Sequence, residues 1–217
     1  SSAVRRSVMS YGNRLFCDQT EAGSGLIHRW GSSKLYRAYF QDYRLFLQRP
    51  ESVAATLVNE DRILIVQTDL KQFYDRVTPK LLHSKIRTLQ TPDDDPGFFD
   101  LASQVLNWSW SDADQRQIKR YKEGAGIPEF DGVALPQGLV AAGFFSNIVL
   151  LDFDEAILGQ IGLEIANGVW LHDACRYVDD IRLTIIAAPG VPQVEAEARV
   201  FAWLQETLTG TSPGLEL

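Results

Sequence analysis

Three aspartates are the residues of this sequence best suited to chemistry. Asp69 ends the apolar stretch "ILIVQTD", and Asp179 and Asp180 are adjacent in "RYVDDIRL". Carboxylates held close together repel each other, and one stays protonated unless a cation lies between them. Carboxylate oxygens are hard ligands of the kind that Mg²⁺ prefers. The pattern indicates a divalent-cation site, provided that the fold brings the two segments together.

Such a site can catalyse phosphoryl transfer, in which an attacking oxygen displaces a leaving oxygen at phosphorus. Two Mg²⁺ ions about 3.5–4 Å apart can hold the attacking and leaving oxygens of an in-line reaction. Neighbouring side chains on a strand point to opposite faces, so a turn is needed at Asp179 and Asp180. We expect this turn to lie beside Asp69. For any one of these acids alone, an exposed turn residue is the ordinary interpretation.

The elements that would position the acids follow from local patterns. Apolar residues at 63–66 predict a strand buried on both faces that ends at Asp69. "CRYVDDIRLTII" predicts a strand, a tight turn and a second strand, with Cys175 as a small buried hydrophobe. Thr78 before Pro79 predicts an N-cap and first turn, with the helix running to about residue 90.

The remaining segments read mostly as helices. A turn at 136–138 leads into a long, largely apolar helix to about Leu158, and such a helix is typically buried. His172 and Asp173 are expected in a loop. The mixed order of strands and helices predicts an α+β domain with a small antiparallel sheet. Further helices are predicted over 34–48, 98–107, 111–122 and 191–208.

Composition narrows the class of protein. The chain has 217 residues, of which 45% are hydrophobic, which suits one sizeable domain or two interleaved subdomains. Its net charge of −7 argues against a nucleic-acid binder, unless the acids have a local role or a basic part is missing. Two distant cysteines without a CxxC pattern argue against zinc and favour a reducing, cytoplasmic location. No apolar run is long enough for a transmembrane helix.

Three segments together resemble a known family. "TDLKQFYDRV", "LPQGLVAAGFFSNIVLLDFDEA" and "RYVDDIRL" resemble, in this order and spacing, palm motifs A, B and C of reverse transcriptases. The resemblance is strongest to the bacterial branch of group II intron, retron and phage-defence (antiviral defence) enzymes. "SYGNRLF" resembles their fingers segment. The likeness spans most of residues 8–187, and the combination of motifs is specific where any one would not be.

The resemblance implies an α+β right-hand polymerase palm, a small antiparallel sheet backed by helices, with N-terminal fingers. It implies fingers at 1–60, palm at 61–90, a fingers/palm insertion at 91–132 and palm again at 133–217. In the family a primer grip and a helical thumb follow. The sequence ends at "GLEL", so we expect the thumb to be absent.

The resemblance also assigns roles to individual residues. Asp69 and Asp179 correspond to the direct ligands of two Mg²⁺ ions, with Mn²⁺ as the alternative ion. Asp180 is the third catalytic acid of the family set. The backbone carbonyl of Leu70 would face the metal that carries the triphosphate.

Four further positions would contact the nucleotide. Tyr74 corresponds to the steric gate, whose ring occupies the place of a 2′-hydroxyl and so favours deoxynucleotides. Gln137 and Gly138 would border the incoming nucleotide, and Arg14 would grip its triphosphate. Ala142 stands where the family often has serine, which we interpret as a variant.

The implied function is an RNA-directed DNA polymerase that adds dNTPs to a primer 3′-hydroxyl by a two-metal mechanism. Its partners would be an RNA template, a DNA or RNA primer, dNTPs and the missing C-terminal thumb or a further domain. One alternative is a template-independent or protein-primed polymerase of a phage-defence system. Another is a catalytically silent palm that binds nucleic acid or protein. A third alternative is an RNA polymerase or a nucleotide cyclase, but the aromatic side chain of Tyr74 argues against the use of ribonucleotides.

Overall fold

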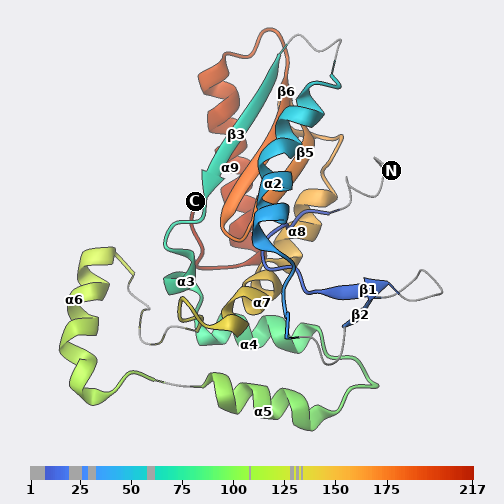
Figure 1. Cartoon of the computed structure of the whole chain (residues 1–217). Helices are drawn as coiled ribbons and strands as arrows, with labels where there is room; N and C mark the ends of the chain where they lie inside the picture. The colour runs from blue at the N-terminus through green and yellow to red at the C-terminus, as the bar shows by residue number, and fades with distance from the viewer. Residues whose placement is uncertain are drawn as a thin grey trace. The chain divides into compact units, whose positions relative to one another are not determined.

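The chain folds into two compact units. The computed structural model describes residues 8–19, 26–28, 33–57, 62–107, 109–127, 130, 132 and 134–217. Helices and antiparallel strands occur in mixed order, which confirms the predicted α+β class (Figure 1). The units take their described residues from Ser1–Asp69 with Ala156–Trp203, and from Leu70–Glu155 with Leu204–Leu217.

The first unit is built around a four-stranded antiparallel sheet in the order β3-β6-β5-β4. Helix α2 packs mainly against β5 and β6. A short hairpin of β1 and β2 belongs to the same unit. The elements are β1 (Cys17–Gln19), β2 (Leu26–His28), α2 (Tyr39–Ala54), β3 (Ile63–Asp69), β4 (Glu164–Ala166), β5 (Val169–Tyr177), β6 (Asp180–Ala187) and the first part of α9 (Gln193–Thr211).

Strand β3 lies at an edge of this sheet, so the prediction that it is buried on both faces is wrong. Val66 is buried, but the side chain of its neighbour Ile65 is 41% exposed. The reason is that, among the described residues, β3 pairs with β6 alone, and α2 packs mainly over β5 and β6. The apolar run correctly indicated a strand but did not indicate its place in the sheet.

Strand β5 contains the residues for which the sequence predicted a loop. Its register with β6 shifts between Leu171 and Asp173, so His172 forms a bulge. Asp173 is buried and accepts hydrogen bonds from Arg49 of α2, with Nε–Oδ2 and Nη2–Oδ1 distances of 2.7 Å. This two-pronged ion pair ties the helix to the sheet.

Beneath α2, Cys175 lies in a buried cluster with Tyr11 and Phe46. Burial raises the pKa of the Cys175 thiol to about 12, because the charged thiolate would lose its hydration. Cys175 is therefore a small hydrophobic residue, as predicted.

The second unit is helical in its described part. Helix α4 begins as the sequence predicted: the Thr78 hydroxyl accepts a hydrogen bond from the Leu81 N–H at 3.1 Å, and Pro79 occupies the first turn. The elements are α3 (Phe73–Arg76), α4 (Pro79–Thr88), α5 (Pro96–Leu106), the 3₁₀ helix η1 (Asp112–Asp114), α6 (Gln115–Ala125), α7 (Val140–Val149), α8 (Leu151–Leu158), which ends in the first unit, and the end of α9.

The long apolar helix predicted to reach Leu158 is two helices. Its backbone leaves the helical conformation at Leu150, where φ is −98° and ψ is 6°, and α8 starts at the next residue. Leu150 and Phe153 are fully buried, as the apolar sequence predicted. Within the described ranges, no helix combines the length and apolarity needed to cross a membrane.

Candidate active site

Strand pairing in the first unit brings two of the predicted acids together. Antiparallel pairing of β3 with β6 sets Asp69 directly opposite Asp180. Side chains of directly opposite residues lie on the same face, with Cβ atoms about 4.5–5.5 Å apart. Both side chains are exposed. Segments far apart in the sequence therefore place two carboxylates side by side at the end of the sheet.

The third acid lies in the turn that joins β5 to β6. Tyr177 pairs with Asp180, so Val178 and Asp179 form a two-residue connection. Val178 has a φ of +58°, a left-handed conformation that β-branched residues rarely adopt. Neighbouring side chains on a strand would point to opposite faces. Because Asp179 lies in the turn and not in the strand, its side chain need not point to the face opposite to that of Asp180.

The electrostatics of the three acids favour a cation. Burial raises the pKa of Asp179, and the charges of Asp180 and Asp69 raise it further, against hydrogen bonds from backbone N–H groups. Partial burial and the charge of Asp69 also raise the pKa of Asp180, while Arg182 acts in the opposite direction. No salt bridge joins any of the three to a basic side chain in the described part of the chain.

The three carboxylates are not gathered into a finished set of ligands. Among the described residues, no three His, Cys, Asp or Glu side chains are arranged to hold a metal ion. The donor chemistry nevertheless suits Mg²⁺, because the oxygens are hard and negatively charged. The backbone brings the acids together, and their side chains would have to close on an ion.

Arg14 belongs to the same unit as the acids, and its guanidinium already makes protein contacts. Its Nε donates to the Ser10 carbonyl at 2.8 Å, and its Nη1 lies 3.5 Å from Asp42 Oδ1. The guanidinium carbon lies 4.3 Å from the centre of the Tyr11 ring. Burial lowers the pKa of Arg14, and the carboxylate of Asp42 opposes that shift.

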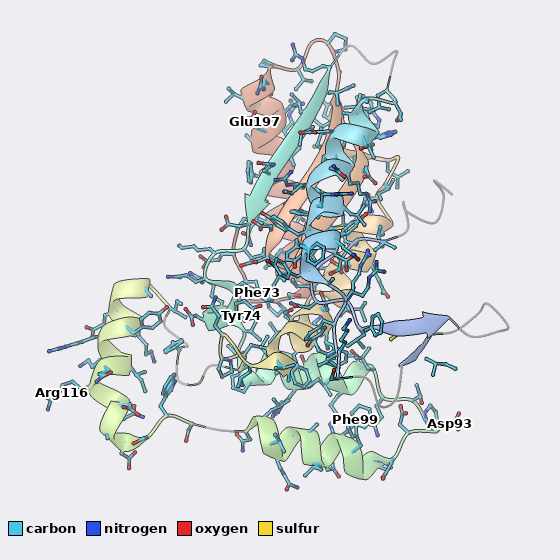
Figure 2. The ribbon with its side chains drawn as sticks, in the orientation of Figure 1. Phe73, Tyr74, Asp93, Phe99, Arg116 and Glu197 are labelled. Atoms are coloured by element: carbon cyan, nitrogen blue, oxygen red, sulfur yellow. The ribbon has the colours of Figure 1, made fainter. Side chains whose placement is uncertain are left out.

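The other predicted nucleotide contacts belong to the second unit. Leu70 is buried directly after β3. Tyr74 lies beside Phe73 on α3, with ring centres 5.2 Å apart (Figure 2). Gln137 and Gly138 are exposed just before α7, and the φ of +96° at Gly138 gives the expected turn.

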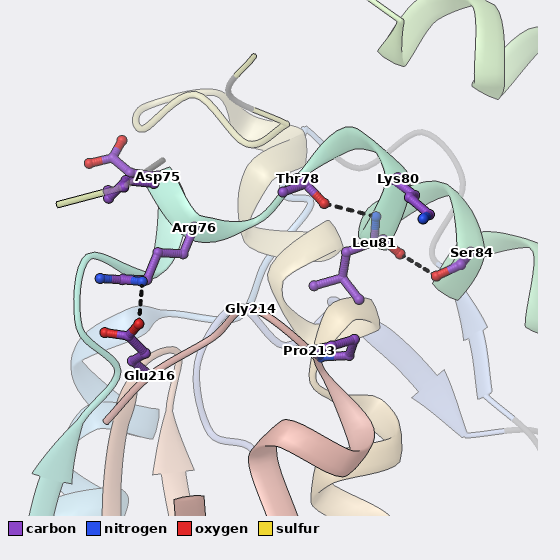
Figure 3. A pocket seen from close by; sticks show the side chains of 10 residues that line it. Asp75, Arg76, Thr78, Lys80, Leu81, Ser84, Pro213, Gly214 and Glu216 are labelled. Atoms are coloured by element: carbon purple, nitrogen blue, oxygen red, sulfur yellow. Dashed lines mark hydrogen bonds and ion pairs between the residues drawn. The ribbon is translucent and has the colours of Figure 1, made fainter. Parts of the chain in front are cut away.

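Helix α3, which carries Tyr74, is held by contacts on two sides. Arg76 Nη1 lies 2.9 Å from Glu216 Oε1 beside a pocket of about 480 Å³ (Figure 3). The hydroxyl of Tyr121 on α6 donates to Asp75. Asp75 is therefore engaged in a structural contact between α3 and α6.

Several residues that shape the site were not found from the sequence. Arg176 is fully buried, and its Nη1 donates to the Val178 carbonyl at 3.0 Å. Gly12 lies against the same turn. A basic residue before "YVDD" and a glycine in "SYGNRLF" are the only signals, and neither indicates burial.

The fold and the site define the class: an α+β protein with a palm-like antiparallel sheet that carries three acids at one end. The chain belongs to the reverse transcriptase (RNA-dependent DNA polymerase) family, whose model matches residues 36–207, more than half of the sequence. It is therefore a nucleotidyltransferase, and the family implies a nucleic-acid template, a primer and dNTPs. No curated protein sequence matches the chain. The bacterial branch, the domain boundaries and the residue roles stay predictions.

Proposed function

We propose that this chain adds dNTPs to a primer 3′-hydroxyl under the direction of an RNA template, with two Mg²⁺ ions held at Asp69 and Asp179. The observation that carries the proposal is the register that sets Asp69 opposite Asp180, at the turn that contains Asp179. Family membership supplies the reaction class.

Each acid has a part in this mechanism. Bound Mg²⁺ would neutralise the charge that develops on the phosphate oxygens and orient the 3′-hydroxyl. Asp69 and Asp179 would provide carboxylate ligands, and the Leu70 carbonyl would provide a backbone ligand. Asp180 would keep the local potential negative and so strengthen cation binding. Mn²⁺, which accepts the same oxygen ligands, would substitute.

Selection of the nucleotide is assigned to the other predicted residues. The Tyr74 ring would occupy the place of a 2′-hydroxyl and exclude ribonucleotides. Gln137 can donate and accept hydrogen bonds, and Gly138 allows close approach of the backbone. Arg14 would have to exchange its contact with Asp42 for the triphosphate.

Primer extension on poly(rA) with an oligo(dT) primer and Mg²⁺ tests the proposal. We expect incorporation of dTTP over UTP, and Tyr74→Ala should raise the share of UTP. Asp179→Asn should reduce incorporation by at least about a hundredfold, because it removes a metal ligand. Asp93→Asn is the matched control, since Asp93 is an exposed loop acid outside the site. Equal activity of Asp179→Asn and the wild type would contradict the mechanism.

A second candidate is a catalytically silent palm that binds nucleic acid or protein. It is favoured by one observation: the described acidic side chains are not arranged as a finished metal site. Calorimetric titration with Mn²⁺ separates the candidates, because a silent palm has no need to bind the ion. Incorporation that persists when poly(rA) is omitted would instead support template-independent or protein-primed synthesis.

A further inference from the structure

The turn that carries Asp179 has a conformation that its own sequence does not favour. Val178 is buried, and its φ of +58° brings the branched side chain against the backbone. Such a conformation persists only where surrounding contacts impose it. The contacts that impose it therefore control where the next residue, Asp179, points.

One of these contacts comes from within β5. The guanidinium of Arg176 donates to the Val178 carbonyl at 3.0 Å and is fully buried. A buried cation is costly unless its hydrogen bonds offset the lost hydration. The bond spans the first half of the turn and ties it to the last residues of the strand.

The second contact comes from the N-terminal segment. The Arg176 N–H donates to the Met9 carbonyl at 2.9 Å, and the Tyr11 N–H donates to the Arg176 carbonyl at 2.8 Å. These bonds bring Gly12 against the turn. A Cβ atom at Gly12 would lie 2.6 Å from Val178 Cγ2 and 2.7 Å from its backbone nitrogen. Only glycine fits this approach.

We propose that Arg176 and Gly12 are positioning residues that hold Val178 in its left-handed conformation and thereby aim the Asp179 carboxylate at the divalent cation. Both residues are buried, so neither is assigned a contact with substrate. The inference rests on the proposed metal mechanism and deepens it. If the hydrogen bond from Arg176 is lost, Val178 relaxes to an ordinary backbone conformation, and Asp179 turns away from Asp69 and Asp180.

The test is calorimetric titration of the whole chain with Mn²⁺, which needs no catalytic activity, together with thermal unfolding. We expect Arg176→Met and Gly12→Ala each to weaken Mn²⁺ binding by about tenfold or more, the effect typical of residues that orient metal ligands. The control is Arg199→Met. It removes another guanidinium of the same unit that donates to a backbone carbonyl, that of Asn167, away from both the turn and the N-terminal segment, and it should bind Mn²⁺ as the wild type does.

A rescue variant distinguishes positioning from mere packing. Glycine adopts a positive φ at no steric cost. Adding Val178→Gly to Arg176→Met should therefore restore part of the lost affinity, whereas a simple packing defect would not respond. If Arg176→Met does not fold, the Gly12→Ala titration decides, and unchanged affinity there overturns the inference.

The outcomes distinguish failure of the proposed metal mechanism from failure of the positioning role alone. A wild-type chain that binds no Mn²⁺ contradicts the metal mechanism and the positioning role with it. A wild-type chain that binds Mn²⁺, alongside an Arg176→Met variant of equal affinity, overturns the positioning role alone.

Discussion

Replacing Asp180 by asparagine should stabilise the metal-free protein while weakening its response to Mg²⁺. Asp180 lies directly opposite Asp69, and like charges in that position destabilise a sheet. Asparagine keeps the shape and removes the charge. Cross-strand charge pairs are worth about 0.2–1 kcal/mol, and we expect the lower part of this range because the side chain is exposed and screened.

The effect of Asp180→Asn on the stability of the metal-free protein should depend on pH. The pKa of Asp180 is raised in the folded protein, first by partial loss of hydration of its largely exposed carboxylate and then by the charge of Asp69. The folded state therefore holds the proton more tightly than the unfolded state, and metal-free stability falls as pH rises through the raised pKa. The gain from Asp180→Asn should be full near neutral pH. It should disappear in acid, where the wild-type carboxyl is itself uncharged.

Urea unfolding with EDTA and with Mg²⁺, near neutral pH and in acid, measures both effects. Mg²⁺ binds only the folded state in this mechanism, so it should raise the free energy of unfolding of the wild type, and it should raise that of the variant by a smaller amount. Asp93→Asn, in an exposed loop, should change neither quantity. If Asp180→Asn is less stable than the wild type in EDTA near neutral pH, the carboxylates are not repelling each other and the reasoning fails.

Three further outcomes are expected. Arg49→Met should lower the free energy of unfolding in urea by about 3–5 kcal/mol, because it leaves Asp173 buried without its partner. Adding Asp173→Leu should recover most of that loss, and equal stability of the single and double variants would refute this. Thr78→Ala should cost about 1 kcal/mol through loss of the N-cap, and Thr78→Ser should cost much less in the same measurement. The raised pKa of Asp179 lets protons compete with Mg²⁺ at a pH above the usual pKa range of an aspartate. The Mg²⁺ affinity measured by calorimetry should therefore begin to fall above that range on acidification, and an affinity that stays constant down to it would contradict the assignment.

The hairpin and its acids could be predicted because their signals are local. Apolar and β-branched residues flank "DD", and the alternation of side chains along strands requires a turn at the two aspartates. The cap at Thr78 is equally local and was also confirmed. A short segment with one dominant signal specifies its own conformation.

The features that the sequence did not indicate depend on distant contacts. The exposure of Ile65 follows from the place of β3 at the sheet edge, which no local pattern encodes. The buried state of Arg176 and the partner of Asp173 arise from pairing with residues more than a hundred positions away. The break at Leu150 has no glycine or proline to mark it. In each case tertiary packing, not local preference, decides the outcome.

The burial of Cys175 gives the protein a single reactive thiol. The chain has two cysteines, and the partly exposed Cys17 is the other. Alkylating reagents attack the thiolate, so a maleimide dye should modify Cys17 alone in the native state. One spectroscopic probe could thus be attached in the N-terminal region without introducing or removing a cysteine, and exposure of the second thiol would report unfolding of the sheet.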